Sequence, residues 1–222
     1  VRKQAQSVAC LSNVKQWSYC WHMYLEDSNG KFPSGDGASG DWPDKLRPFY
    51  KARGALTLCP SATKPYSEGG NVPFGAWRCT PQGVGCTGFE DKPGLDYGSY
   101  GMDEWLGDRE GDNYWRTREQ KKASNIPLFF DCVFIDTYPS HTQGPPDIDG
   151  IVVLPNEMHL ICINRHKGYI NTVFLDLNVR RVGLKALLTL TWHRNFDNQG
   201  IWTTAGGAIA CDRPPWLRPF RD

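Results

Sequence analysis

The sequence predicts an α+β fold in which one long N-terminal helix packs on a small antiparallel β-sheet with long disulfide-tied loops. Residues 1–27 contain no Gly or Pro, and short runs of β-forming residues follow them, separated by turn residues. The chain also has eight cysteines, an even number. A helix followed by strands favours α+β over a doubly wound α/β fold, in which the two element types alternate.

The helix comes first. Apolar residues recur at roughly helical spacing from Val8 to Leu25, and Asn29-Gly30 and Pro33 supply a stop signal. The prediction divides the chain into a helix, residues 1–28, and a globular β-rich domain, residues 29–222.

Shorter elements are expected in the second part. Pro43 lies near the start of a short helix ending at Tyr50. Residues 61–98 are interrupted by Gly and Pro and form an irregular excursion, which Cys79 and Cys86 are expected to tie. Strand-like runs are expected at 55–62, 96–106, 126–136, 159–164, 171–177 and 179–184.

Composition excludes several classes of function. The formal net charge is +1, from 25 basic and 24 acidic residues, which argues against a partner such as nucleic acid or an anionic membrane. No apolar run approaches the ~20 residues of a membrane span, and no signal peptide is present. An exported protein without such a signal suggests that the sequence begins after a segment that was removed or left out.

The cysteines indicate an oxidising compartment. None forms the CxxC spacing of zinc ribbons or thioredoxins, so a disulfide framework is the preferred interpretation, with its pairing open. Cys10 and Cys20, on one helix, would be roughly 15 Å apart and could not bond to each other. The disulfide candidates are Cys10, Cys20, Cys59, Cys79, Cys86, Cys132, Cys162 and Cys211.

His166 and Asp176 stand out in the segment NRHKGYINTVFLDLNVRRV. The preferred interpretation is structural: a turn follows His166, a strand runs through residues 172–175, and Asp176 begins the next turn. His166 would hydrogen-bond across the sheet, and its replacement by Ala should weaken folding. A catalytic dyad and a metal site are the alternatives, although no nucleophile is designated.

Calcium is the one cofactor that the loops suggest. DSNG starts like a calcium-binding loop, but Ala38 stands where its final glutamate is expected. Such Asp-Gly loops are more often ordinary turns. The candidate ligands are Asp27, Asn29, Asp36, Asp147 and Asp149.

No enzyme class is indicated. The chain lacks the GxSxG, HExxH and P-loop patterns, and its five histidines are scattered. Its tryptophans could form a sugar-binding platform, but burial is the more common environment of Trp.

Several segments together resemble a known family. ACLSNVKQWSYCWHMYLEDSNGKFP, LTLCPSA, DYGSYGMDEWL, IPLFFDC, NRHKGYINTVFLDLNVRRV and LLTLTWHRNFDNQGIWT are similar, in this order, to prepilin-type proteins with a His-x9-Asp-Gly signature. These are relatives of type IV pilins and type II secretion pseudopilins. Two positions depart from the pattern: Leu177 replaces the signature Gly and Asn178 the following His.

The resemblance implies a type IV pilin-like fold, with the family's hydrophobic N-terminal half of the helix missing from this sequence. The implied function is a structural subunit of an extracellular or cell-surface filament or tube that self-assembles by heterologous contacts. The alternative is a minor pseudopilin or adhesin-like module that recognises polysaccharide or protein cargo. Partners would be other copies, other pilin-like subunits or polysaccharide, without nucleic acid, and the membrane only through the missing segment. Pseudopilins often bind calcium in a loop, which adds to the calcium prediction.

Overall fold

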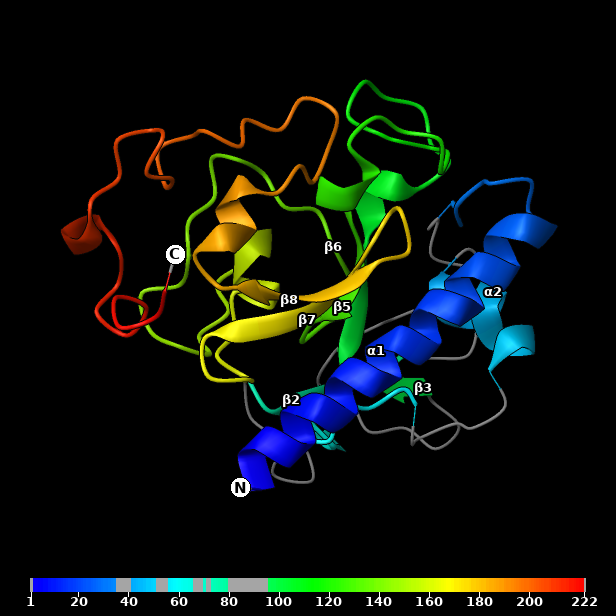
Figure 1. The fold of residues 1–222 in the computed structure, drawn as a ribbon, viewed down its shortest axis with the longest axis horizontal. Helices are drawn as coiled ribbons and strands as arrows, with labels where there is room; N and C mark the ends of the chain where they lie inside the picture. Colours follow the sequence, from blue (N-terminus) through cyan, green and yellow to red (C-terminus); the bar gives the residue numbers. More distant parts are fainter. Residues whose placement is uncertain are drawn as a thin grey trace.

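The predicted helix is the longest element of the fold. A computed structural model describes residues 2–34, 41–50, 56–65, 70, 73–79 and 96–221. Helix α1, Arg2–Asp27, crosses the face of a sheet and packs against β5, β7 and β8 (Figure 1). None of the helices in these ranges combines the length and apolar character needed to cross a membrane.

The remaining elements are short. A second helix, α2, spans Trp42–Leu46, and a 3-10 turn at Arg47–Phe49 extends it to the predicted end. Further 3-10 turns lie at Glu104–Leu106, Ala123–Asn125, Glu157–Leu160, Ala186–Thr189 and Ala210–Asp212. The strands are β1 Lys64–Pro65, β2 Gly75–Cys79, β3 Asp96–Gly98, β4 Tyr100–Asp103, β5 Pro127–Asp131, β6 Asp136–Thr137, β7 Tyr169–Phe174 and β8 Val179–Gly183.

The main sheet has five strands in the order β6-β4-β5-β7-β8. Neighbours are antiparallel except β4 and β6, which are parallel, so the sheet is mixed rather than wholly antiparallel as predicted. Strand β2 pairs with β1 in parallel and with β3 in antiparallel orientation, inside the predicted excursion 61–98. The α+β class is therefore confirmed, with a more regular excursion than expected.

Two hydrophobic clusters lie on opposite faces of the main sheet. Successive residues of a strand point to opposite faces, and β5 shows this directly. Phe129 packs with Trp17 and Trp21 of α1, whereas Phe130 packs edge-on against Trp192 of the C-terminal segment. The helix therefore covers one face and the irregular C-terminal part the other.

Two predicted strands are wrong. The described part of 55–62 forms turns, because its carbonyl groups accept hydrogen bonds from side chains of α1 and not from a neighbouring strand. Asn13 Nδ2 donates to Leu58 O, and Trp17 Nε1 donates to Leu56 O. Residues 159 and 160 end the 3-10 turn Glu157–Leu160, and residues 161–164 follow as a turn and irregular backbone, with Cys162 N donating to Met158 O. Their apolar side chains are buried as in a strand, which periodicity alone cannot distinguish.

Gly101 in β4 should not tolerate a side chain. A Cβ there would lie 2.8 Å from both Cys132 Cβ and Phe134 O. We expect Gly101→Ala to lower the free energy of unfolding by about 1–3 kcal/mol, measured by urea denaturation. Gly183→Ala in β8 is the matched control, because its nearest contacts would be 3.7 Å and 4.0 Å away. Equal losses in the two variants would contradict the steric explanation.

Candidate functional site

Four side chains from distant parts of the sequence meet in the interior. Cys10 lies on α1, Cys59 in the turns after α2, Asp131 at the end of β5 and His166 before β7. One potential ligand atom from each lies within 4.8 Å of all the others, and all four residues are buried. We call these four residues the Cys-Asp-His cluster.

Asp131 is the centre of this cluster. Its Oδ1 accepts hydrogen bonds from Cys10 Sγ at 3.3 Å and from Arg165 Nη1 at 3.1 Å. Its Oδ2 accepts from Asn171 N at 2.8 Å and lies 3.3 Å from His166 Nε2. Burial alone raises the pKa of a carboxyl group, but His166 and Arg165 outweigh it and hold the pKa of Asp131 below its usual value.

Arg165 fixes that carboxylate in place. The guanidinium is fully buried and also donates to the carbonyl oxygens of Pro73, Ser99 and Cys132. The ion pair is thus tied to the backbone on several sides, as a buried charge pair requires.

Cys59 and His166 form the second contact, with Sγ and Nε2 3.3 Å apart. Burial disfavours the thiolate, yet hydrogen bonds from Cys10 and His166 lower the pKa of Cys59 to about 6. Burial also disfavours the imidazolium, but Asp131 raises the pKa of His166 to about 9. Both shifts favour transfer of the thiol proton of Cys59 to His166.

The environment of Cys10 favours the protonated thiol. Burial and the negative charges of Cys59 and Asp131 raise the pKa of Cys10 well above its ordinary value. Tyr100, whose hydroxyl lies 3.3 Å from Cys10 Sγ, also has a raised pKa through burial.

The arrangement differs from a cysteine-nucleophile triad. In such a triad one imidazole nitrogen faces the thiol and the other faces an orienting group. Here Cys59 and Asp131 both approach Nε2 of His166, while Nδ1 is buried without a hydrogen-bond partner among the described residues. Two thiols, an imidazole and a carboxylate around one point are instead a ligand set for a transition metal.

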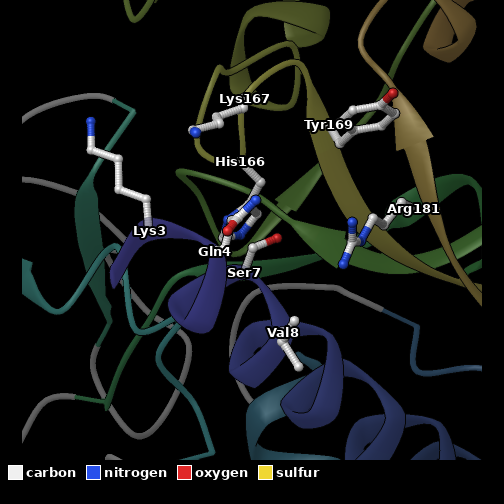
Figure 2. A pocket seen from close by; sticks show the side chains of 8 residues that line it. All are labelled: Lys3, Gln4, Ser7, Val8, His166, Lys167, Tyr169 and Arg181. Carbon is white, nitrogen blue, oxygen red and sulfur yellow. The ribbon is translucent and has the colours of Figure 1, made fainter. Parts of the chain in front are cut away.

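A cavity of about 430 Å³ borders the cluster. Figure 2 shows it between the first turns of α1 and the residues around β7 and β8, with His166 on its wall. Among the described residues, Lys3, Lys167 and Arg181 give the cavity a positive lining without any carboxylate. The cavity next to the buried His166 is therefore basic.

The structure separates His166 from Asp176, which lie at the two ends of β7. The turn interpretation of Asp176 is confirmed: its Oδ1 accepts from Asn178 N at 3.1 Å, between β7 and β8. His166 contacts the cluster rather than a partner across the hairpin. Leu177 adopts φ = 66°, so the turn keeps the left-handed conformation that the signature Gly would favour.

The predicted disulfides are not found among the cysteines whose side chains are described. These are free thiols at Cys10, Cys20, Cys59, Cys132, Cys162 and Cys211. Cys10 and Cys59 lie close together but are held by Asp131 and His166, and Cys20 donates to Phe49 O. Cys86 and the side chain of Cys79 lie outside the described residues.

The predicted calcium ligands do not join the cluster. Asp27 and Asn29 are at the end of α1, with Asn29 at φ = 54° as in a helix C-cap. Asp147 is exposed, while Asp149 Oδ1 accepts from Asn164 N. Asp36 lies outside the described residues. The calcium site thus stays a prediction.

Sequence reasoning recognised His166 but missed its partners. Asp131 was detectable, since it is an acidic residue inside the apolar run IPLFFDCVF, and a carboxylate buried in a strand needs a cationic partner. Arg165, next to His166, was the corresponding cation. The proximity of Cys10 and Cys59 carries no such local signal.

Comparisons with protein-family models, curated proteins and solved structures find no match. The resemblance to the His-x9-Asp-Gly proteins therefore stays a prediction, based on the quoted segments.

Proposed function

We propose that this protein is a structural subunit of an extracellular pilin-like filament or tube, which assembles through its N-terminal helix. The observation that carries the proposal is a discontinuous stripe of large apolar side chains on the outer face of α1, interrupted by the exposed polar residues Ser12, Gln16 and Glu26. Val8, Tyr19 and Met23 are 57%, 57% and 42% exposed. At about 100° per residue, positions 8, 19 and 23 fall within roughly 60° of one another.

This stripe lies opposite the face that packs on the sheet. The buried residues of α1 include Val14, Trp17 and Trp21, which project roughly 180–240° away from Val8. A helix of a globular protein normally has a polar outer face. The three large apolar side chains exposed on this face therefore support a contact with another molecule.

The charges of α1 favour another copy of the same chain as that molecule. Arg2 and Lys3 are at its N-terminal end, and Glu26 and Asp27 at its C-terminal end. This order opposes the helix dipole, which prefers acidic residues in the first turn and basic ones in the last. Copies displaced along the helix axis would bring the basic end of one against the acidic end of the next. Such a heterologous contact repeats without closing and forms a filament.

The test is the assembly state of the purified chain, followed by sedimentation velocity and negative-stain microscopy. We expect concentration-dependent polymers, and expect Val8→Glu/Tyr19→Glu to abolish them without lowering the melting temperature. Ile201→Glu is the matched control, because Ile201 is 69% exposed but lies in the C-terminal segment. A chain that stays monomeric at every concentration would overturn the proposal.

A further inference from the structure

We propose that the Cys-Asp-His cluster is a structural zinc site, with Cys10 Sγ, Cys59 Sγ, His166 Nε2 and one carboxylate oxygen of Asp131 as its ligands. The inference is independent of filament assembly, since it concerns the interior of a single chain.

The spacing of the ligand atoms fits tetrahedral zinc. Zn–S bonds of about 2.3 Å and Zn–N or Zn–O bonds of about 2.0–2.1 Å place neighbouring ligand atoms roughly 3.3–3.8 Å apart. Cys59 Sγ and His166 Nε2 are 3.3 Å apart, as are Cys10 Sγ and Asp131 Oδ1. His166 Nε2 is 3.3 Å from the other carboxylate oxygen, Oδ2, and the four ligand atoms all lie within 4.8 Å of one another. Small movements of side chains would suffice to complete the coordination.

The hydrogen bonds show where the metal would bind. Asp131 accepts hydrogen bonds from Arg165 and from the backbone N–H of Asn171, and both bonds would remain when a metal binds. Its other two contacts, with Cys10 Sγ and His166 Nε2, connect one ligand to another. A zinc ion would replace the protons in these two contacts, while Arg165 would continue to orient the carboxylate, as outer-shell partners of metal ligands do.

The buried charges also balance with zinc bound. Two thiolates, the Asp131 carboxylate, the Arg165 guanidinium, a neutral imidazole and Zn²⁺ sum to zero. Zinc needs both cysteines as thiolates and His166 Nε2 without a proton, so any protons on these ligand atoms would be released when the metal binds. Neutrality matters because an uncompensated charge in the interior is very costly.

The choice of metal follows from the ligand types. Thiolate and imidazole ligands suit zinc, whereas calcium takes only oxygen ligands. All four residues are buried and come from four separate segments, which is the closed environment of a structural rather than a catalytic zinc site. Zinc would join α1, the turns around Cys59, β5 and β7.

The test uses the full chain, purified with a reductant, treated with chelator and titrated with Co²⁺ and then Zn²⁺. We expect one Co²⁺ per chain, with a thiolate-to-cobalt absorption band and the strong visible bands of tetrahedral cobalt. Zn²⁺ should displace the cobalt and raise the melting temperature. A folded, reduced chain that gives no thiolate–cobalt band would overturn the proposal without the need for any variant.

A pair of variants on the same helix provides the control. Cys10→Ser should lower zinc affinity by more than the roughly 10–100-fold typical of outer-shell changes. Cys20→Ser should leave it unchanged, because Cys20 is also buried on α1 but donates to Phe49 O outside the cluster. A Cys10–Cys59 disulfide, found by peptide mapping of protein isolated without reductant, would likewise overturn the zinc assignment.

Discussion

Replacement of Arg165 by Met is expected to lower the free energy of unfolding by about 3–5 kcal/mol. Methionine fills most of the same space but carries no charge, so the buried carboxylate of Asp131 would keep only His166 as a cationic partner. The carbonyl oxygens of Pro73, Ser99 and Cys132 would lose their donor at the same time. The measurement is urea denaturation in the presence of a chelator, so that metal binding does not contribute.

Two further variants separate the charge effect from the loss of a long side chain. Arg118→Met removes an arginine that pairs with Glu26 near the surface, and exposed pairs contribute only about 0–1 kcal/mol. Arg165→Met/Asp131→Asn removes both buried charges and should recover part of the loss, as a double-mutant cycle would show. If Arg165→Met were as mild as Arg118→Met, the buried pair would not have the role inferred for it.

The parts of the fold that were predictable have local causes. The long helix follows from 27 residues without Gly or Pro, and the β7–β8 hairpin from strand-forming runs around a turn at Asp176. The residues at 55–62 were predicted as a strand because their composition suits one. Whether they form one depends on Asn13 and Trp17, which are about forty residues away in sequence. The side chains of these two residues donate hydrogen bonds to carbonyl groups that a strand would use for pairing.

The candidate site depends on contacts that no local pattern contains. The spacing of His166 and Asp176 suggested that the two residues belong together, but they lie at opposite ends of β7. The contact partner of His166 is Asp131, in a strand paired with β7. The eight cysteines indicated cross-linking, but their count alone does not distinguish a disulfide from two thiols that share a proton or a metal.

A second large effect is expected from Asp136 in β6. Burial and the neighbouring charges of Asp41 and Glu157 raise the pKa of this carboxyl from 3.8 to about 7, although Arg109 opposes the shift. In the folded protein Asp136 therefore stays protonated at pH values where the unfolded chain has already released the proton. Its contribution to stability is fully present below about pH 4, declines as the pH rises and is lost above about pH 7.

Asp136→Asn should remove this dependence, because the amide stays neutral at every pH. The variant and the parent protein should have similar unfolding free energies near pH 4. At pH 8 the variant should be more stable by roughly 2–4 kcal/mol, since one pKa unit corresponds to about 1.4 kcal/mol. Asp147→Asn, at an exposed carboxylate, is the control for the substitution itself. If Asp136→Asn differed from the parent protein by the same amount at pH 4 and at pH 8, the carboxyl of Asp136 would ionise freely in the folded chain. The predicted result would instead show that the burial of Asp136, together with the charges of Asp41 and Glu157, lowers the stability of this protein under mildly alkaline conditions.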